Sequence, residues 1–130
     1  HFLVVDGDHC ILNLVATVLR QTGYRVNCAE DGEAGWEAVV TANFDIMISD
    51  HEMPRLKGLD LLRRVRAAPL TVPVILASGS IPWHEPDLLP LLSPGVVLEK
   101  PYSAADLLAK VRRFLAPIAG VTDSTAFAPA

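Results

Sequence analysis

Short apolar runs alternate in this chain with longer stretches of helical periodicity, and this alternation limits the fold more than any other feature. Five apolar runs predict strands at residues 2–5, 24–29, 44–48, 73–77 and 96–98. Apolar residues recur at helical spacing between them, as in 9–20, 58–67 and 103–115. Strands that alternate with helices pair in parallel through right-handed crossovers. The sequence therefore predicts an α/β fold, a doubly wound five-stranded parallel sheet with helices on both faces.

The third apolar run ends at a carboxylate, in the stretch FDIMISDHEMP at residues 44–54. Its apolar residues are successive rather than alternating, which is typical of a strand buried on both faces. Asp50 follows this run, and Pro54 prevents it from continuing as an interior strand. Open α/β sheets place their chemistry at the carboxyl ends of the strands. We interpret Asp50 as a nucleophile toward phosphorus, with a solvated loop aspartate as the alternative on this stretch alone.

Polar residues also close three of the other predicted strands. They are Asp6 and Asp8, on either side of Gly7, after the first strand, Ser78 after the fourth and Lys100 after the fifth. A carboxylate that attacks phosphorus forms an acyl phosphate, and cations and donors must meet the charge on the phosphoryl oxygens. Mg²⁺ takes carboxylate and carbonyl oxygens plus water, lysine adds a point charge, and serine adds one hydrogen bond. The joint placement of these groups at four strand ends predicts a phosphoryl-transfer site.

These residues, in this order and spacing, resemble the receiver domain of two-component response regulators. The marks are LVVDGD in the first strand, DHEMP after the third, the later Gly58, PVILASG in the fourth strand and EKPY after the fifth. The resemblance covers residues 2–116, which is nearly the whole chain. It implies a flavodoxin-like fold of the receiver type. It also implies a protein that shifts between two conformations rather than a turnover enzyme.

The resemblance also implies a role for each strand-end residue. It implies that Asp50 is phosphorylated by a sensor histidine kinase or a phosphotransfer protein. It implies that Lys100 contacts the phosphoryl group and that Ser78 is the switch hydroxyl. Asp6, Asp50 and the backbone carbonyl of Glu52 would then bind Mg²⁺. A homodimer is a possible assembly for such a domain.

Two positions depart from the family pattern. Receivers usually carry two adjacent acids after the first strand, whereas here the second position is Gly7. Losing a carboxylate should weaken Mg²⁺ binding, and we hypothesise that Asp8 or the side chain of Glu52 substitutes for it. Three residues before Lys100 the family commonly has an aromatic switch residue, whereas this chain has Val97. The usual output route is therefore open to question.

Two alternatives follow from these departures and from the first motif. The chain could be a degenerate receiver, a protein-interaction module that works without phosphorylation. FLVVDGD also resembles the first motif of haloacid-dehalogenase-type phosphatases, in which Asp6 is the nucleophile and Asp8 the acid. That class needs a later acidic pair, whereas the fifth strand is followed by Glu99, Lys100 and Pro101. The phosphatase class also gives no role to Asp50, the carboxylate after the third strand.

Length, composition and charge limit the class of protein. The chain has 130 residues, enough for one domain with a sizeable core, which we place at residues 1–116, followed by a flexible tail or linker at 117–130. No apolar run is long enough to span a membrane, and no secretory leader is evident. We therefore expect a cytoplasmic protein with no membrane association. A net charge of -4 argues against nucleic-acid binding through this domain.

Several further side chains receive a structural interpretation. His51 is expected to be a loop residue that tunes access, because a carboxylate nucleophile needs no base. The arginines at 63, 64 and 66 are expected to form a solvated helix edge. Cys10 and Cys28 have no metal spacing, and we expect them to be small core residues. Prolines recur every four residues from Pro82 to Pro94, which predicts a short or broken helix there.

Overall fold

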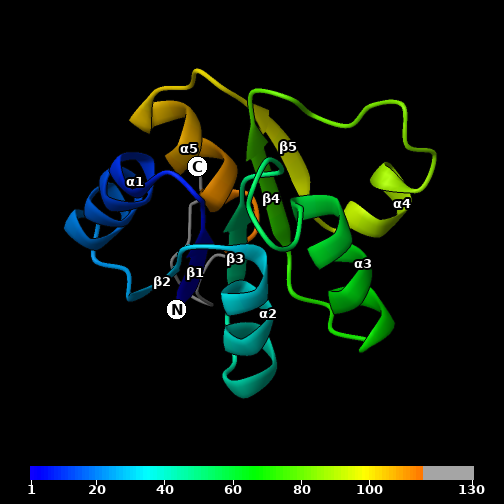
Figure 1. Cartoon of the computed structure of the whole chain (residues 1–130). Coiled ribbons are helices and arrows are strands. Elements are labelled where there is room, and N and C mark those ends of the chain that lie inside the picture. The colour runs from blue at the N-terminus through cyan, green and yellow to red at the C-terminus, as the bar shows by residue number, and fades with distance from the viewer. Residues whose placement is uncertain (116–130) are drawn as a thin grey trace.

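The computed structural model of the chain describes residues 1–115, in which five strands and five helices alternate without exception (Figure 1). The strands are β1 (Phe2–Val5), β2 (Val26–Ala29), β3 (Ile46–Ser49), β4 (Val74–Ser78) and β5 (Val96–Glu99). The helices are α1 (His9–Gln21), α2 (Gly32–Thr41), α3 (Gly58–Ala67), α4 (Leu88–Leu92) and α5 (Ala104–Arg112). The predicted order of elements is confirmed.

All five strands pair in parallel in the order β2-β1-β3-β4-β5. β1 is paired on both edges, with Val5 opposite Ala29 of β2 and Ser49 of β3. The chain therefore reverses its direction of winding at β1, and the carboxyl ends of β1 and β3 lie side by side. Crevices at such reversal points are where doubly wound sheets bind their ligands. The predicted fold class is confirmed.

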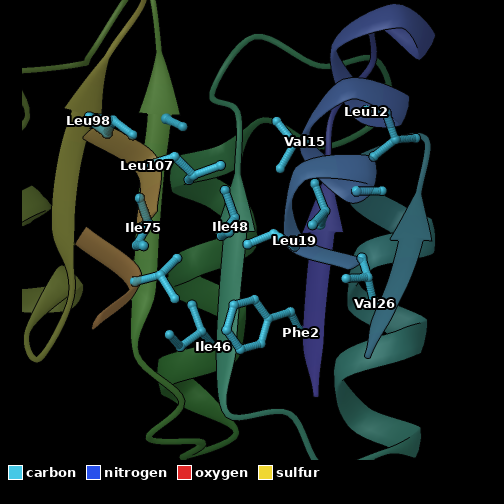
Figure 2. Packing of buried hydrophobic residues seen from close by; sticks show 14 residues of the cluster. Phe2, Leu12, Val15, Leu19, Val26, Ile46, Ile48, Ile75, Leu98 and Leu107 are labelled. Carbon is cyan, nitrogen blue, oxygen red and sulfur yellow. The ribbon is translucent and has the colours of Figure 1, made fainter. Parts of the chain in front are cut away.

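The sheet separates two apolar cores, because successive side chains of a strand point to opposite faces. On one face Phe2 and Val4 of β1 pack with Ile46 and Ile48 of β3 beneath α1 and α5 (Figure 2). The residues that α1 and α5 bury there are Leu12, Val15, Ala16, Leu19, Leu107 and Val111. On the other face the alternate residues of the same strands, such as Leu3, pack against α2, α3 and α4. With both faces covered, the strands can be apolar throughout.

Helix caps follow the sequence signals closely. Asp31 accepts a hydrogen bond from the Ala34 amide at the start of α2. Ser103 and Asp106 form a reciprocal capping box at the start of α5. Side-chain oxygens at these positions satisfy amides that have no partner within the helix. These predicted helix starts are confirmed.

The proline-rich segment forms one short helix, as predicted. α4 has five residues and contains Pro90, which cannot donate the backbone hydrogen bond of a longer helix. The helix begins at Leu88, two residues after Pro86. A surrounding network of arginine contacts, described below, holds the segment against α3.

One prediction, the burial of the two cysteines, is wrong, and another concerns residues that the structure does not describe. Cys10 and Cys28 are both exposed, because Cys10 lies on the outer side of α1 and Cys28 on the edge strand β2. The predicted tail at 117–130 lies outside the described residues. Within residues 1–115, no helix is both long enough and apolar enough to cross a membrane.

Candidate functional site

Backbone hydrogen bonds bring the strand-end residues together at one edge of the sheet. The Asp50 amide donates to the Val5 carbonyl at 3.0 Å, which ties the end of β3 to the end of β1. The Lys100 amide donates to the Ser78 carbonyl at 3.0 Å, which ties the end of β5 to that of β4. Backbone hydrogen bonds between neighbouring strands therefore fix the positions of these predicted site residues.

The ammonium group of Lys100 lies between two buried carboxylates. Its Nζ is 3.1 Å from Oδ2 of Asp6 and 3.5 Å from Oδ2 of Asp50. The carboxylate side chains are 7% and 11% exposed, so water screens them little, yet Asp50 is not sealed from solvent. One cation faces two anions, and the cluster keeps an excess negative charge. Buried charge of this kind attracts a further cation.

The other oxygen of each carboxylate accepts a backbone amide. Oδ1 of Asp6 accepts from the Asp8 amide at 2.9 Å, and Oδ1 of Asp50 accepts from the His51 amide at 2.7 Å. These charge-assisted bonds fix the orientation of both carboxylates. The Oδ2 atoms are therefore the ones that meet Lys100.

The pKa of the Tyr102 phenol is affected by the same negative charge. Burial first, and then the charges of Asp6 and Asp50, raise the pKa of the Tyr102 phenol to about 12. The ring is therefore neutral near pH 7. Tyr102 belongs to the EKPY stretch, whose pattern predicts no separate role for the phenol, because an aromatic residue after a strand end is most simply explained by packing.

Ser78 and Gly7 complete the edge. Ser78 is buried, and its Oγ accepts the Ser80 amide at 3.1 Å. A Cβ placed on Gly7 would lie 3.0 Å from Cδ of Pro54 and 3.9 Å from Cα of Met53. A side chain at position 7 would therefore point at the loop that carries Glu52. Glycine leaves that side of the site without a carboxylate.

The two residues proposed to replace that carboxylate are engaged elsewhere. Asp8 caps α1, where its Oδ1 accepts from the amides of Cys10 and Ile11. The Glu52 side chain is 54% exposed and pairs with Lys57 at 3.2 Å. In the part of the chain that the structure describes, no group of three or more His, Cys, Asp or Glu side chains is placed to hold a metal ion. Any cation site here rests on two carboxylates and main-chain oxygens.

Mg²⁺ suits such a sparse donor set. This ion keeps several of its waters and is commonly held by one or two carboxylates together with phosphate oxygens. Asp6 and Asp50 supply two carboxylates with a net excess of negative charge, since Lys100 neutralises only one of them. The residues present therefore fit a weakly held divalent cation.

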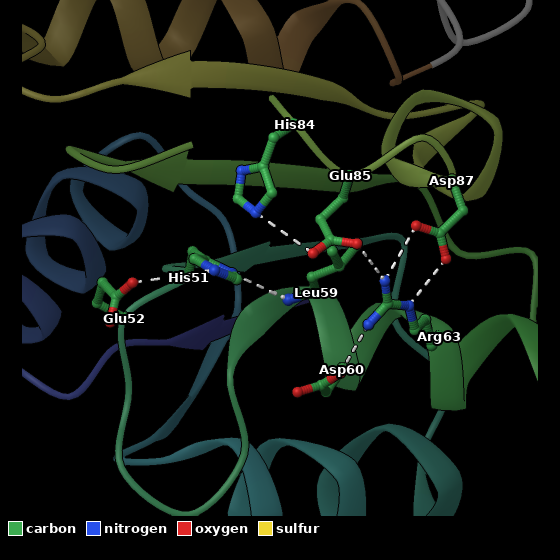
Figure 3. Close-up of polar contacts among 8 residues, drawn as sticks. All are labelled: His51, Glu52, Leu59, Asp60, Arg63, His84, Glu85 and Asp87. Atoms are coloured by element: carbon green, nitrogen blue, oxygen red, sulfur yellow. Dashed lines mark hydrogen bonds and ion pairs between the residues drawn. The ribbon is translucent and has the colours of Figure 1, made fainter. Parts of the chain in front are cut away.

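Three side chains have contacts that the sequence did not predict. His51 is buried rather than lining an open loop, and its Nδ1 accepts the Leu59 amide at 3.2 Å. Arg63 binds Asp60, Glu85 and Asp87 (Figure 3). Arg66 donates to four main-chain carbonyls, those of Leu70, Val72, Leu91 and Leu92. The expectation of a merely solvated arginine edge is therefore wrong.

An apolar groove adjoins the site. It has a volume of about 530 Å³ and lies between α1 and the start of α5. Ile11, Leu14 and Val18 of α1 form one wall, and Tyr102 and Leu107 belong to the other. Lys100 lines this groove and also contacts both carboxylates. Lys100 is therefore shared by the groove and the site.

Comparison with known proteins identifies the class of this protein. The family model for the response regulator receiver domain matches residues 2–112. The chain belongs to this family. It is a receiver domain of the kind found in response regulators of two-component systems, as the sequence resemblance indicated. This family match favours the receiver over the haloacid-dehalogenase-type phosphatase.

Curated relatives extend beyond the matched region. The transcriptional regulatory protein DltR of Streptococcus agalactiae serotype III is 32% identical over 110 residues, which are 85% of this chain and 49% of DltR. The probable transcriptional regulatory protein SilR of Salmonella typhimurium is 33% identical over 115 residues, 87% of this chain and 50% of SilR. The chain thus spans about half the length of these relatives. Both are regulatory proteins by name.

Solved structures agree with the family assignment. The chemotaxis response regulator CheY4 of Vibrio cholerae superposes with a TM-score of 0.78 at 28% identity, covering 88% of this chain and 97% of CheY4. The response regulator TrrA of Thermotoga maritima, solved in complex with Mg(2+)-BeF, gives a TM-score of 0.76 at 29% identity, covering 88% and 97%.

Proposed function

We propose that Asp50 accepts a phosphoryl group from a histidine of a sensor histidine kinase or a phosphotransfer protein. The observation that carries this proposal is the contact of Lys100 Nζ with Oδ2 of Asp50, at 3.5 Å, on a carboxylate that is nearly but not fully buried. A nucleophile toward phosphorus needs an accessible oxygen and a nearby positive charge. Asp6, at 7% exposure and 3.1 Å from the same ammonium, is the less accessible carboxylate.

The transfer needs no general base. An oxygen of the Asp50 carboxylate attacks phosphorus, the bond from phosphorus to the donor imidazole nitrogen breaks, and the imidazole keeps the electron pair. The product is an acyl phosphate on Asp50. Lys100 then offers its charge to the phosphoryl oxygens, and Ser78 is the hydroxyl that can hydrogen-bond to them. The protein modifies itself rather than turning over a substrate.

Asp6, Asp50 and the backbone carbonyl of Glu52 are the groups that would hold Mg²⁺. The bound ion would supply positive charge next to the phosphoryl oxygens. Asp8 is engaged as a helix cap, so we leave it outside this set. Because Gly7 contributes no carboxylate, the affinity should be lower than with an acid at that position.

Phosphorylation would bias two conformations of the domain. Ser78 sits at the end of β4, and Val97 lies opposite Leu76 in the neighbouring strand. A valine has no hydroxyl or ring to follow a serine toward a phosphoryl group. We therefore expect the output of this domain to depend on the backbone at the end of β4 rather than on a rotating aromatic side chain.

The apolar groove beside Lys100 is the surface that we assign to the phosphoryl donor. It is lined mainly by apolar side chains, and Leu14 in its wall is 63% exposed. A donor whose histidine must reach Asp50 has to dock within reach of Lys100, which the groove and the site share. A kinase in the cytoplasm would be the partner, and we assign no nucleic acid to this domain.

Intact-mass analysis after incubation with acetyl phosphate and Mg²⁺ tests the proposal. The wild type should gain the mass of one phosphoryl group, and Asp50→Asn should gain none. Asp45→Asn, which changes a 66% exposed aspartate, is the matched control and should behave as the wild type. A wild type that gains no mass, with or without its cognate kinase, would instead support the degenerate receiver.

A further inference from the structure

The helix that follows the phosphoacceptor loop begins without a conventional cap. Lys57 occupies the N-cap position of α3 and makes no side-chain capping bond. The first amides of a helix have no partner within it, and an unsatisfied amide near the core costs free energy. Another residue must therefore satisfy them.

His51 supplies acceptors for two of these amides. Its carbonyl accepts the Gly58 amide at 2.9 Å, and its Nδ1 accepts the Leu59 amide at 3.2 Å. The imidazole points from the loop to the start of α3 (Figure 3). A residue seven positions upstream of Gly58 thus caps the helix across the loop.

The contact with α3 fixes the roles of the two ring nitrogens. Because Nδ1 accepts the Leu59 amide, it carries no proton. A neutral imidazole with a free Nδ1 carries its proton on Nε2. That Nε2 lies 3.9 Å from a carboxylate oxygen of Glu52, which is consistent with this tautomer.

The same residue holds the phosphoacceptor. The His51 amide donates to Oδ1 of Asp50 at 2.7 Å, and the His51 carbonyl belongs to the peptide that leads into Glu52. A movement of His51 would therefore turn the Asp50 carboxylate and shift the Glu52 carbonyl together. The imidazole connects both groups to the rigid frame of α3.

The loop that His51 closes needs such anchors. Arg55 has a φ of 73°, a left-handed conformation that is unfavourable for a residue other than glycine. At the other end of the loop, Gly58 lets the start of α3 approach the backbone of Asp50 and His51. A Cβ at this position would overlap the Asp50 carbonyl oxygen and lie 2.8 Å from Cα of His51. Strained backbone persists only where the surrounding contacts fix it.

We propose that His51 is a positioning residue for the cation site. Its Nδ1, bonded to the Leu59 amide, holds the 51–57 loop so that the Asp50 carboxylate and the Glu52 carbonyl face the same ion. His51 itself contacts neither the ion nor the phosphoryl group. This inference rests on the proposed function, because it assumes the cation ligands named there.

Three substitutions of His51 test the inference. His51→Asn keeps an acceptor close to the position of Nδ1, His51→Phe keeps a ring but no acceptor, and His51→Gln moves the amide one carbon outward. The exposed His9 provides the matched control, His9→Asn. Hydrogen exchange at the Leu59 amide measures the cap, and calorimetric titration with Mg²⁺ alone measures the site.

His51→Phe should speed exchange at Leu59 at least about tenfold, as expected for one lost hydrogen bond. It should also weaken Mg²⁺ binding roughly tenfold, as outer residues of metal sites do when removed. His51→Asn should stay within about twofold of the wild type on both measures. If His51→Phe does not fold, His51→Gln takes its place with the same expected direction.

Three results would overturn the inference, and they are distinguishable from one another. If the wild type binds Mg²⁺, Asp50→Asn abolishes binding and His51→Phe leaves the affinity unchanged, then His51 has no positioning role and the proposed site stands. If the wild type binds no Mg²⁺ at all, the inference and the metal part of the proposed function fail together. Equal losses in His51→Asn and His51→Phe would also contradict it.

Discussion

Two segments border the edge of the sheet that carries Asp50, and different kinds of contact anchor them to the same helix. The 51–57 loop is tied to the start of α3 by hydrogen bonds to the buried His51. The segment between β4 and α4 is tied to the middle of α3 by Arg63, whose side chain is 40% exposed, through Glu85 and Asp87. The first anchor is shielded from water, and the second is open to it.

This contrast indicates which parts of the receiver can move. A buried hydrogen bond is insensitive to salt and costly to break, whereas exposed ion pairs are screened and individually weak. The loop that presents the proposed cation ligands is therefore held rigidly, and the segment after Ser78 is held loosely at its Arg63 end. A switch that begins at Ser78 would meet little resistance there.

The close approach at Gly58 offers the strongest way to break the rigid anchor. Gly58→Ala should destabilise the protein by about 3 kcal/mol, because the new Cβ overlaps the Asp50 carbonyl oxygen. Urea unfolding measures the change. Gly79→Ala is the control: its Cβ would lie 3.9 Å from Cβ of Lys100, an ordinary contact. Equal stability of the Gly58→Ala protein and the wild type would contradict the close approach.

The side chain of Arg66 is a third anchor, which bonds to main-chain carbonyls. Its loss should cause the second largest loss of stability. It donates to the carbonyls of Leu91 and Leu92 at the end of α4, and to two further carbonyls before β4. Arg66→Met keeps much of the aliphatic stem but leaves these acceptors without a donor, so we expect a loss of about 2 kcal/mol. The exposed Arg112, changed to Met, is the matched control. Similar unfolding midpoints for the two variants would argue against the carbonyl network.

Arg63→Gln should have a smaller effect that depends on salt. Its three acidic partners are exposed by 35–53%, so added salt screens the attraction in the wild type. The difference in thermal midpoint between wild type and Arg63→Gln should shrink to less than half at roughly 1 M NaCl. The difference caused by His51→Phe should not change with salt. A salt-independent effect of Arg63→Gln would remove the contrast between the two anchors.

The smallest effect should be an acid sensitivity of the same ion cluster. The hydrogen bond from Arg63 holds the pKa of Asp87 below its ordinary value of 3.8. A carboxyl group whose pKa falls on folding stabilises the protein above its unfolded pKa, and this contribution is lost as the pH falls below 3.8. The wild type should therefore exceed Asp87→Asn in thermal midpoint near neutral pH and converge with it in acid. A constant difference across this range would contradict the assignment.

The strand ends could be predicted from the sequence, because parallel strands must deliver Asp6, Asp50 and Lys100 to one edge. The helix caps could be predicted because the side chains of Asp31 and Ser103 each accept the amide three residues further along the chain. Such arguments need only local spacing or the sheet order, both of which the pattern of apolar residues carries.

The anchors could not be predicted in this way. The bond between His51 and Leu59 depends on the path of a loop that passes through a positive φ at Arg55, and no periodicity encodes that path. The partners of Arg66 are main-chain carbonyls, which every residue carries, so no side-chain pattern marks them. Cys10 was misplaced because cysteine is often buried, whereas this one lies on the outer face of α1.

The most direct test of the central claim is to find which carboxylate carries the phosphoryl group. After incubation with acetyl phosphate and Mg²⁺, borohydride reduces the acyl phosphate to an alcohol, and peptide sequencing by mass spectrometry locates the reduced residue. We predict that the reduced residue is Asp50 and that Asp6 in the same sample is unchanged. Reduction at Asp6, or at neither residue in a protein shown to have gained the phosphoryl mass, would contradict the account.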